Sequence, residues 1–311
     1  MITRTWLHPV QAVRYSWKNI LFSLVCAGAA YAMYTLPAIP RVEMPVAVIT
    51  VLGTALAIIL GFRNASAYDR WWEARKIWGG VVNESRTFTR MALTLADPRH
   101  THPKRRAEME RLVRNHLAWV NALRLQLRSI RDEAVWRERV GVHLEPETYD
   151  LIMSRTNRVT QLGILQGRLI KLMNMEHVMD DFSYVQIDDT MTRLTDLQGM
   201  AERIKNTPLP RPYDYYTMAF LSLFLVFFPF SVADHFADMG RTWIVFPLTV
   251  VVGWIFYQIY VFGKVMSNPF ENWSTDIPMD AITTTIMIDL KETLGDKDVP
   301  APLTPAGGRL M

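Results

Sequence analysis

Four long segments of this chain carry no charged residue, and they constrain the fold more than any other feature. At about 1.5 Å per residue, helices of this length span close to the ~30 Å hydrocarbon core of a bilayer. Buried helices of soluble proteins rarely run so far without a charge, which disfavours a soluble core. A signal peptide is disfavoured because no small-residue cleavage site follows the first segment. The segments therefore predict transmembrane helices over 20–36, 45–62, 217–233 and 242–263.

The composition fits a protein that lies partly in lipid and partly in water. Of 311 residues 50% are apolar, yet 21% are Asp, Glu, Lys or Arg. Such a chain is too apolar for an ordinary cytosolic domain and too charged for a bundle wholly inside a membrane. The single cysteine, Cys26, lies within the first predicted span, so no disulfide framework is expected.

Basic residues beside the predicted spans set their orientation. Arginines and lysines precede the first span and follow the second and fourth, whereas the loops 37–44 and 234–241 each hold one arginine beside acidic residues. By the positive-inside rule, both termini and the region 63–215 are cytoplasmic. These flanking bases account for the pI near 9.2, and no nucleic-acid motif is present, so no nucleic-acid partner is expected.

The cytoplasmic region is predicted to be helical. From residue 103 to 128 one stripe recurs at steps of four and three, as on one buried helix face: Met109, Val113, His116, Val120, Leu123 and Leu127. We interpret His116 on this face as a hydrogen-bonded packing residue. Further helices are expected over 146–172 and 187–205. Because strand-like alternation is absent, the predicted fold class is an all-α membrane protein.

No sequence motif of an enzyme is found. The chain lacks a P-loop, G-x-G-x-x-G, H-E-x-x-H and G-x-S-x-G. His100 and His102 stand in a basic stretch without a nearby cluster of cysteines or carboxylates, so we interpret them as loop residues and not metal ligands. The sequence therefore predicts no enzyme, no catalytic residue, no cofactor and no metal.

One line of side chains in the second predicted span has the spacing of a pore lining. Thr54, Ile58 and Phe62 recur every four residues and lie along one side of a helix. If several copies of the chain surround an axis, these residues form three stacked rings, and a narrow apolar ring can gate ions by dewetting. In the alternative, which periodicity alone favours, the line packs against another helix of the same chain.

Three motifs resemble the bacterial members of the bestrophin family. They are LGFRNASAYDRWWEARKIWG after the second span, GMAERIKNTPLP before the third and NPFENWSTDIPMD after the fourth. The Arg-Trp-Trp at Arg70, Trp71 and Trp72 is shared more widely in that family. Together with the spans, the resemblance covers residues 1–290 and leaves 291–311 as a flexible or subunit-wrapping tail.

The resemblance implies a homopentameric ion channel in the bacterial inner membrane, which conducts small monovalent ions passively through one axial pore. Carried over by position, the neck is Thr54, Ile58 and Phe62, and the same helix would continue past it as a cytosolic wall. The family usually has an apolar residue where Thr54 stands, so the outermost ring should be wetter. Below the neck, sideways packing would fix the junction through Arg70, Trp71, Trp72 and Trp78.

The sign of the conducted ion is left open by the sequence. Continuing the pore line down the helix brings Asp69 and Glu73, and rings of these carboxylates would favour cations such as sodium. In the alternative they pair with Arg63, Arg70 or Arg75 on the same helix, and chloride is equally eligible. The family includes anion channels in animals and cation-selective members among bacteria. The two carboxylates slightly favour a cation-selective channel.

Calcium gating is disfavoured by the segment after the fourth span. Animal bestrophins follow Asn-Pro-Phe with acidic residues that clasp Ca²⁺, whereas here only Glu271 and Asp276 could supply carboxylates. A Ca²⁺ site needs about six to eight oxygen ligands.

A rival function is a non-conducting membrane scaffold or sensor whose cytosolic helices bind a partner. A second constriction is expected deeper in the cytosolic region, near 164–172, without a chosen residue.

Overall fold

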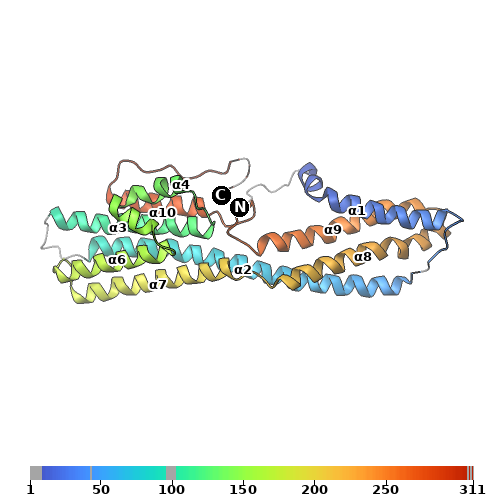
Figure 1. The fold of residues 1–311 in the computed structure, drawn as a ribbon, viewed down its shortest axis with the longest axis horizontal. Coiled ribbons are helices and arrows are strands. Elements are labelled where there is room, and N and C mark those ends of the chain that lie inside the picture. The colour runs from blue at the N-terminus through green and yellow to red at the C-terminus, as the bar shows by residue number, and fades with distance from the viewer. Residues whose placement is uncertain (1–8, 43, 96–102, 307, 309, 311) are drawn as a thin grey trace. The chain divides into compact units, whose positions relative to one another are not determined.

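The structure is a computed structural model that describes residues 9–42, 44–95, 103–306, 308 and 310. Helices and loops make up the described residues, with no β-strand among them (Figure 1), so the all-α prediction is confirmed. In chain order the elements are α1 (Pro9–Thr35), α2 (Val46–Thr94), α3 (Pro103–Leu127), α4 (Glu133–Arg139), η1 (Gly141–His143), α5 (Pro146–Met153), α6 (Arg158–Met175), α7 (Asp181–Asn206), α8 (Arg211–Asp238), η2 (Thr242–Ile244), α9 (Val245–Met266) and α10 (Met279–Leu294).

The described helices form two compact units. The first, which we call the apolar unit, contains α1, α2 as far as Trp71, α8, η2 and α9. The second, the polar unit, contains α2 from Trp72 onward, α3 to α7, η1 and α10. Helix α2 is continuous and contributes to both units.

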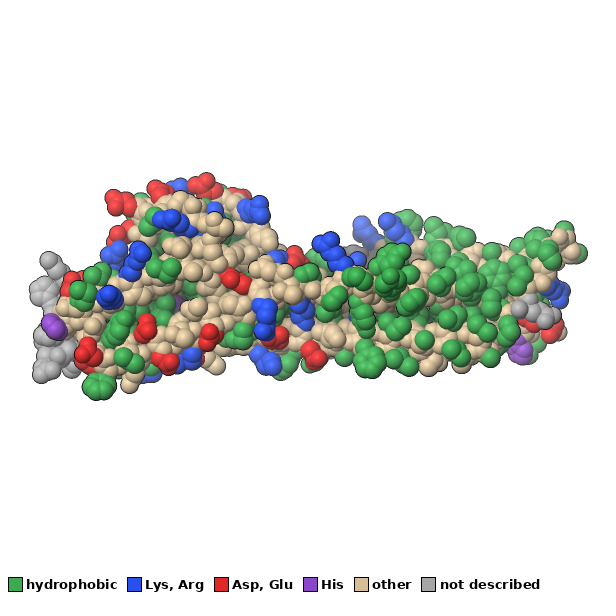
Figure 2. Space-filling view, turned by 60° about the horizontal axis from the view of Figure 1, so that its bottom comes forward, with side chains coloured by type: hydrophobic (Ala, Val, Ile, Leu, Met, Phe, Trp, Pro, Cys, Tyr) green, Lys and Arg blue, Asp and Glu red, His purple; other side chains and the backbone are tan. Residues whose placement is uncertain are grey.

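The apolar unit carries apolar side chains both inside and outside. Inside, Leu56 and Leu60 of α2 pack with Leu221 and Phe224 of α8 and with Tyr260 of α9. Outside, large apolar side chains stay exposed on the same helices, and Figure 2 shows them gathered over this unit. Helices that are apolar on every side are typical of membrane spans.

Among the described residues, three helical stretches are long and apolar enough to cross a membrane: Val46–Thr94, Arg211–Asp238 and Thr242–Met266. They contain the third and fourth predicted spans and all of the second except Pro45. Helix α1 is not among these three stretches, and its last 18 residues, which end at Thr35, already include the polar Lys18 and Asn19. It packs against α8 and α9, and a fourth crossing by α1 stays a prediction.

Helix α3 is the centre of the polar unit. It packs against α6 and α10, and α6 packs in turn against α7 (Figure 1). The predicted buried face of α3 is confirmed: Val113, His116, Val120, Leu123 and Leu127 are buried, and Met109 is half-buried.

The prediction of one helix over 146–172 is wrong. The structure has two helices, α5 and α6, because the side chain of Asn157 caps α6 by accepting a hydrogen bond from the Thr160 N–H at 3.1 Å. Helix α7 likewise begins earlier than predicted, because Asp180 accepts from the Ser183 N–H at 2.9 Å. The sequence patterns do not predict α4 or α10.

The first residues of the C-terminal tail are ordered by the polar unit. Helix α10 continues to Leu294 and ends at Gly295, whose φ of 76° is the left-handed conformation that glycine favours. Asp296 then accepts hydrogen bonds from both terminal nitrogens of Arg114 on α3, at 2.8 and 3.0 Å. Lys291 donates to the Asp298 carbonyl at 2.8 Å. Flexibility or subunit wrapping stays a prediction for the residues beyond.

Gly263 of α9 faces α2 with no room for a side chain. A Cβ there would overlap Oδ1 of Asn64 and lie 2.9 Å from Nη1 of Arg63. We expect Gly263→Ala to push α9 from α2 and lower the unfolding free energy by about 1–3 kcal/mol, measured by thermal melting. The control is Gly199→Ala on α7, where a Cβ meets nothing within 4 Å. Equal melting temperatures for the two variants would contradict this close approach.

Candidate functional site

The predicted neck line lies on the exposed side of α2 within the apolar unit. The relative accessibility is 54% for Ile58 and 67% for Phe62 in the single chain. Thr54 is also exposed, whereas Leu56 and Leu60 bury the opposite side of the helix. These exposures disagree with the alternative in which the line packs against another helix of the same chain. Whatever covers these three side chains in the membrane must therefore lie outside the single chain.

The exposed side of α2 is weakly polar on either side of the two apolar residues. The hydroxyl of Thr54 donates to the Thr50 carbonyl at 2.8 Å, and that of Ser66 donates to the Phe62 carbonyl at 3.0 Å. Such bonds satisfy the hydroxyl proton within the helix. The oxygen lone pairs remain available to water, which fits the wetter outer ring expected at Thr54.

Directly after Phe62, the side chain of Arg63 points to the buried side of α2 and is only 2% exposed. Its Nη1 donates to the Tyr260 carbonyl of α9 at 2.8 Å, and its Nη2 pairs with Asp214 of α8. The guanidinium also lies 4.7 Å from the centre of the Tyr260 ring. Asn64 donates to another α9 carbonyl at 3.0 Å. We call this set of contacts the Arg63 clasp. It joins three helices beside the neck line.

The two carboxylates below the neck line are placed differently from each other. Asp69 is exposed and makes no ion pair or hydrogen bond with any described residue. Glu73 pairs with Arg203 of α7. The alternative that Glu73 pairs with arginines of α2 is therefore wrong, because an arginine of another helix reaches it first. A rule that considers charge pairs within one helix cannot find a partner on another helix.

The predicted junction residues differ in how deeply they pack. Nε of Arg70 donates to the Ser267 carbonyl at the end of α9, at 2.6 Å. Trp71 stacks on the tyrosine three residues before it, with ring centres 6.2 Å apart. Trp78 is fully buried in the polar unit, whereas Trp72 is largely exposed. A shared role of these residues in fixing the junction stays a prediction.

The segment between α9 and α10 holds its two carboxylates apart. Glu271 accepts from Lys205 at 2.7 Å. Asp276 is buried, and one oxygen accepts from the Trp273 N–H at 3.0 Å while the other has no hydrogen-bond partner among the described residues. Burial raises the pKa of Asp276 to about 6. Within the described ranges, no three His, Cys, Asp or Glu residues gather as metal ligands would. The argument against calcium gating stays a prediction.

His116 is a buried packing residue, as predicted. Its Nε2 lies 2.9 Å from the Ser85 hydroxyl, and its Nδ1 lies 3.4 Å from the Gln166 side-chain oxygen. Burial lowers the pKa of His116 to about 4, so the ring is neutral near pH 7. His100 and His102 lie outside the described residues.

A second constriction is not singled out by the structure. Ile164 and Leu172 of α6 are both exposed. Phe182, in the first turn of α7, is more exposed than any other large apolar side chain of the described residues, and no sequence pattern points to it.

Comparison with known proteins identifies the family. Residues 12–292 match the family model of the bacterial and fungal bestrophin proteins. The chain therefore belongs to the bestrophin family, as its three motifs predict.

Relatives and solved structures agree with this assignment. The chain is 25% identical over 289 residues to the voltage-dependent anion channel-forming protein YneE of Salmonella typhi, covering 93% of this chain and 90% of that one. It is 27% identical over 277 residues to a voltage-dependent anion channel-forming protein of Ralstonia nicotianae, covering 89% and 86%. A crystal structure of a mutant bacterial bestrophin homologue from Klebsiella pneumoniae shares 25% identity and the fold, with a TM-score of 0.78 over 89% of this chain and 98% of that one.

The raised pKa of Asp276 predicts that its contribution to stability depends on pH. The folded chain keeps this proton up to about pH 6, whereas the unfolded chain loses it near the ordinary value of 3.8. Between these values folding takes up a proton, so the contribution to the unfolding free energy falls as pH rises, by up to about 3 kcal/mol.

We therefore expect wild type to lose stability relative to Asp276→Asn between pH 4 and pH 6 in chemical denaturation. Asp188→Asn, at an exposed position on α7, should follow wild type throughout. A difference between wild type and Asp276→Asn that stays constant across this range would contradict the burial of an ionisable Asp276.

Proposed function

We propose that this chain forms a homopentameric ion channel that conducts small monovalent ions passively across the bacterial inner membrane. The observation that carries the proposal is the exposure of Ile58 and Phe62 on α2, directly beside the buried Arg63 clasp. In a closed ring of identical copies, the exposed Ile58 and Phe62 of every copy face the same axis. The names of the relatives, which are anion channel-forming proteins, support the same function.

In such a ring, each copy adds Thr54, Ile58 and Phe62 to three stacked rings. An ion that enters the rings of Ile58 and Phe62 loses water and meets no polar ligand, so a narrow neck is closed to ions when it dewets. The hydroxyl of Thr54 admits water at the outer end and shortens the dry part. The Arg63 clasp keeps α2 from turning, which preserves the diameter of the rings.

For the sign of the ion we propose anions such as chloride, although the sequence tilts toward cations. Glu73 is neutralised by Arg203, which leaves Asp69 as the unpaired carboxylate of the two. Lys76, further along the same line, is exposed and offsets the charge of Asp69. Without a net negative ring, the names of the relatives favour anions.

The proposed topology follows from charge and helix length. Helices α2, α8 and α9 cross the bilayer, and α1 makes a fourth crossing packed against α8 and α9. Both termini and the polar unit then lie on the cytoplasmic side, where the flanking arginines and lysines are favoured.

Removing the bulk of the neck should widen and wet it. We expect Ile58→Ala and Phe62→Ala each to raise single-channel conductance or open probability, because the dry stretch becomes shorter and broader. Ile255→Ala, at an exposed position on α9, is the matched control and should leave both quantities unchanged. Unchanged recordings for both neck variants would place the gate elsewhere. Absence of ion flux from sealed liposomes that hold the folded protein would overturn the channel itself.

Neutralising the carboxylates below the neck should shift selectivity without loss of stability. In liposomes under a salt gradient, Asp69→Asn combined with Glu73→Gln should move the reversal potential toward that of the anion. The melting temperature should hardly change, because the pair of Glu73 with Arg203 is solvent-exposed and contributes about 0–1 kcal/mol.

The matched control removes an equivalent pair of carboxylates on α7. In Asp188→Asn with Asp189→Asn, the Asp188 side chain has no partner among the described residues and Asp189 pairs with Arg193. An unshifted reversal potential in the Asp69 and Glu73 variant would place both carboxylates outside the ion pathway.

A further inference from the structure

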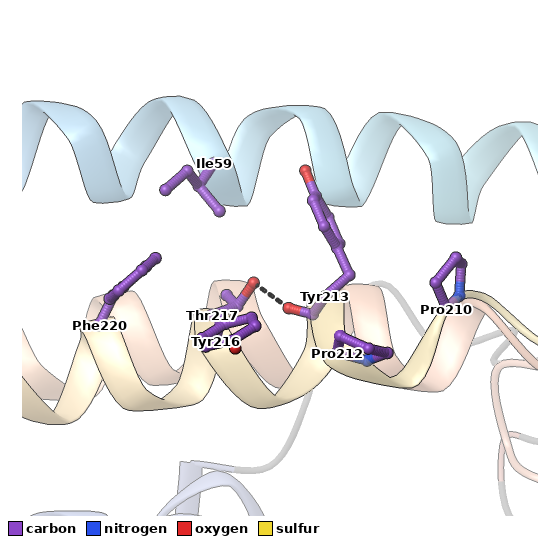
Figure 3. Close-up of a pocket in the computed structure, with 7 residues that line it drawn as sticks. All are labelled: Ile59, Pro210, Pro212, Tyr213, Tyr216, Thr217 and Phe220. Carbon is purple, nitrogen blue, oxygen red and sulfur yellow. Dashed lines mark hydrogen bonds between the residues drawn. The ribbon is translucent and has the colours of Figure 1, made fainter.

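A groove in the apolar unit runs between α2 and the start of α8, and its lining is almost wholly apolar (Figure 3). It is an open groove with a volume of about 490 Å³. Ile59 of α2 lies across from Tyr213, Tyr216 and Phe220 of α8. The hydroxyl of Thr217 donates to the Tyr213 carbonyl at 2.7 Å, so this lining residue does not offer a free donor to a ligand. The groove thus suits a hydrocarbon chain.

An uncompensated positive charge stands at one end of this groove. Arg211, between the lining residues Pro210 and Pro212, is exposed and has no partner among the described residues. The nearby carboxylate of Asp214 is already neutralised by Arg63. An apolar groove with an exposed arginine in the chain segment that forms its end is complementary to a molecule with a hydrocarbon chain and an anionic head.

We propose that the groove binds one acyl chain of an anionic phospholipid, with the lipid phosphate at Arg211. This proposal rests on the proposed insertion of the apolar unit in a membrane. The lining follows α8 from Pro210, which precedes the predicted span 217–233, to Phe220, which lies inside it. The groove therefore begins at the membrane interface and reaches into the start of the hydrocarbon core. Tyr213 and Tyr216 combine an apolar ring with a polar tip, as aromatic residues at membrane interfaces do.

A second copy of the chain is the other candidate to cover this groove. Apolar side chains of a neighbour would fill the groove without matching the charge of Arg211, whereas one phospholipid supplies both an acyl chain for the groove and a phosphate for the arginine. Ile59 is adjacent to Ile58 of the neck line, so a bound acyl chain would touch the helix that carries the neck. Lipid composition would then influence the probability that the neck is open.

The test is photolabelling of the purified full-length chain in phosphatidylcholine vesicles. The probe is a phosphatidylglycerol with a photoactivatable group midway along one acyl chain, and adducts are mapped by peptide mass spectrometry. We expect adducts concentrated on residues 210–220 and around Ile59. Arg211→Gln should reduce labelling of these residues about fivefold, the effect of one interfacial cationic side chain. Arg241→Gln, at an exposed position past the other end of α8, should leave it unchanged.

The labelling pattern separates failure of the lipid site from failure of the channel. Val251 and Phe262 of α9 are exposed and should collect adducts from bulk lipid if the apolar unit is inserted. Adducts on α9 with none in the groove would show that a neighbouring copy covers it, and would overturn the lipid site alone. Groove labelling that Arg211→Gln leaves unchanged would also overturn it. Absence of adducts everywhere would overturn membrane insertion and the site with it.

Discussion

The guanidinium of Arg63 is buried between three helices, and the arrangement of the apolar unit depends on it. A charge out of water is costly unless it is paired and hydrogen-bonded, and Asp214 and the Tyr260 carbonyl meet both needs. Loss of the carboxylate would leave a buried charge and cost up to about 3–5 kcal/mol, less to the extent that water reaches the partly exposed Asp214. Helix α2 therefore cannot turn or slide against α8 and α9 without breaking this contact. Gly263, which leaves no room for a side chain, holds the same helices at close range.

A fixed rotation of α2 determines which side chains it shows to its surroundings. With Leu56, Leu60, Arg63 and Ala67 on the buried side, Ile58 and Phe62 must face outward from the single chain. In the proposed pentamer this same rotation aims both residues at the axis, so the contact that stabilises one subunit also shapes the neck shared by all. Membrane-spanning helices need such polar anchors because lipid offers no hydrophobic drive for helices to associate.

Features set by the local pattern of residues were predictable from the sequence, and features set by contacts between distant residues were not. The apolar segments and the buried face of α3 follow from period and length alone. The break between α5 and α6 depends on one helix cap at Asn157. The helical pattern of residues on both sides of Asn157 gives no sign of this break. The ion-pair partners of Arg63 and Glu73 lie 151 and 130 residues away, so no spacing rule could find them. The neck line could be assigned to a pore only with the help of the family resemblance. The spacing of an exposed apolar line is the same whether it faces lipid, a neighbouring copy or a pore.

The most direct test of a pore lined by α2 is chemical modification of a cysteine placed at position 62. Because the native Cys26 is buried, a cysteine placed in the neck can be modified selectively by a charged, membrane-impermeant thiol reagent. If α2 lines the pore, the reagent should reduce ion flux through Phe62→Cys in liposomes. It should leave flux unchanged in wild type and in Phe262→Cys, where the exposed phenylalanine of α9 is replaced instead. Full modification of Phe62→Cys without any change in flux would contradict a pore lined by α2.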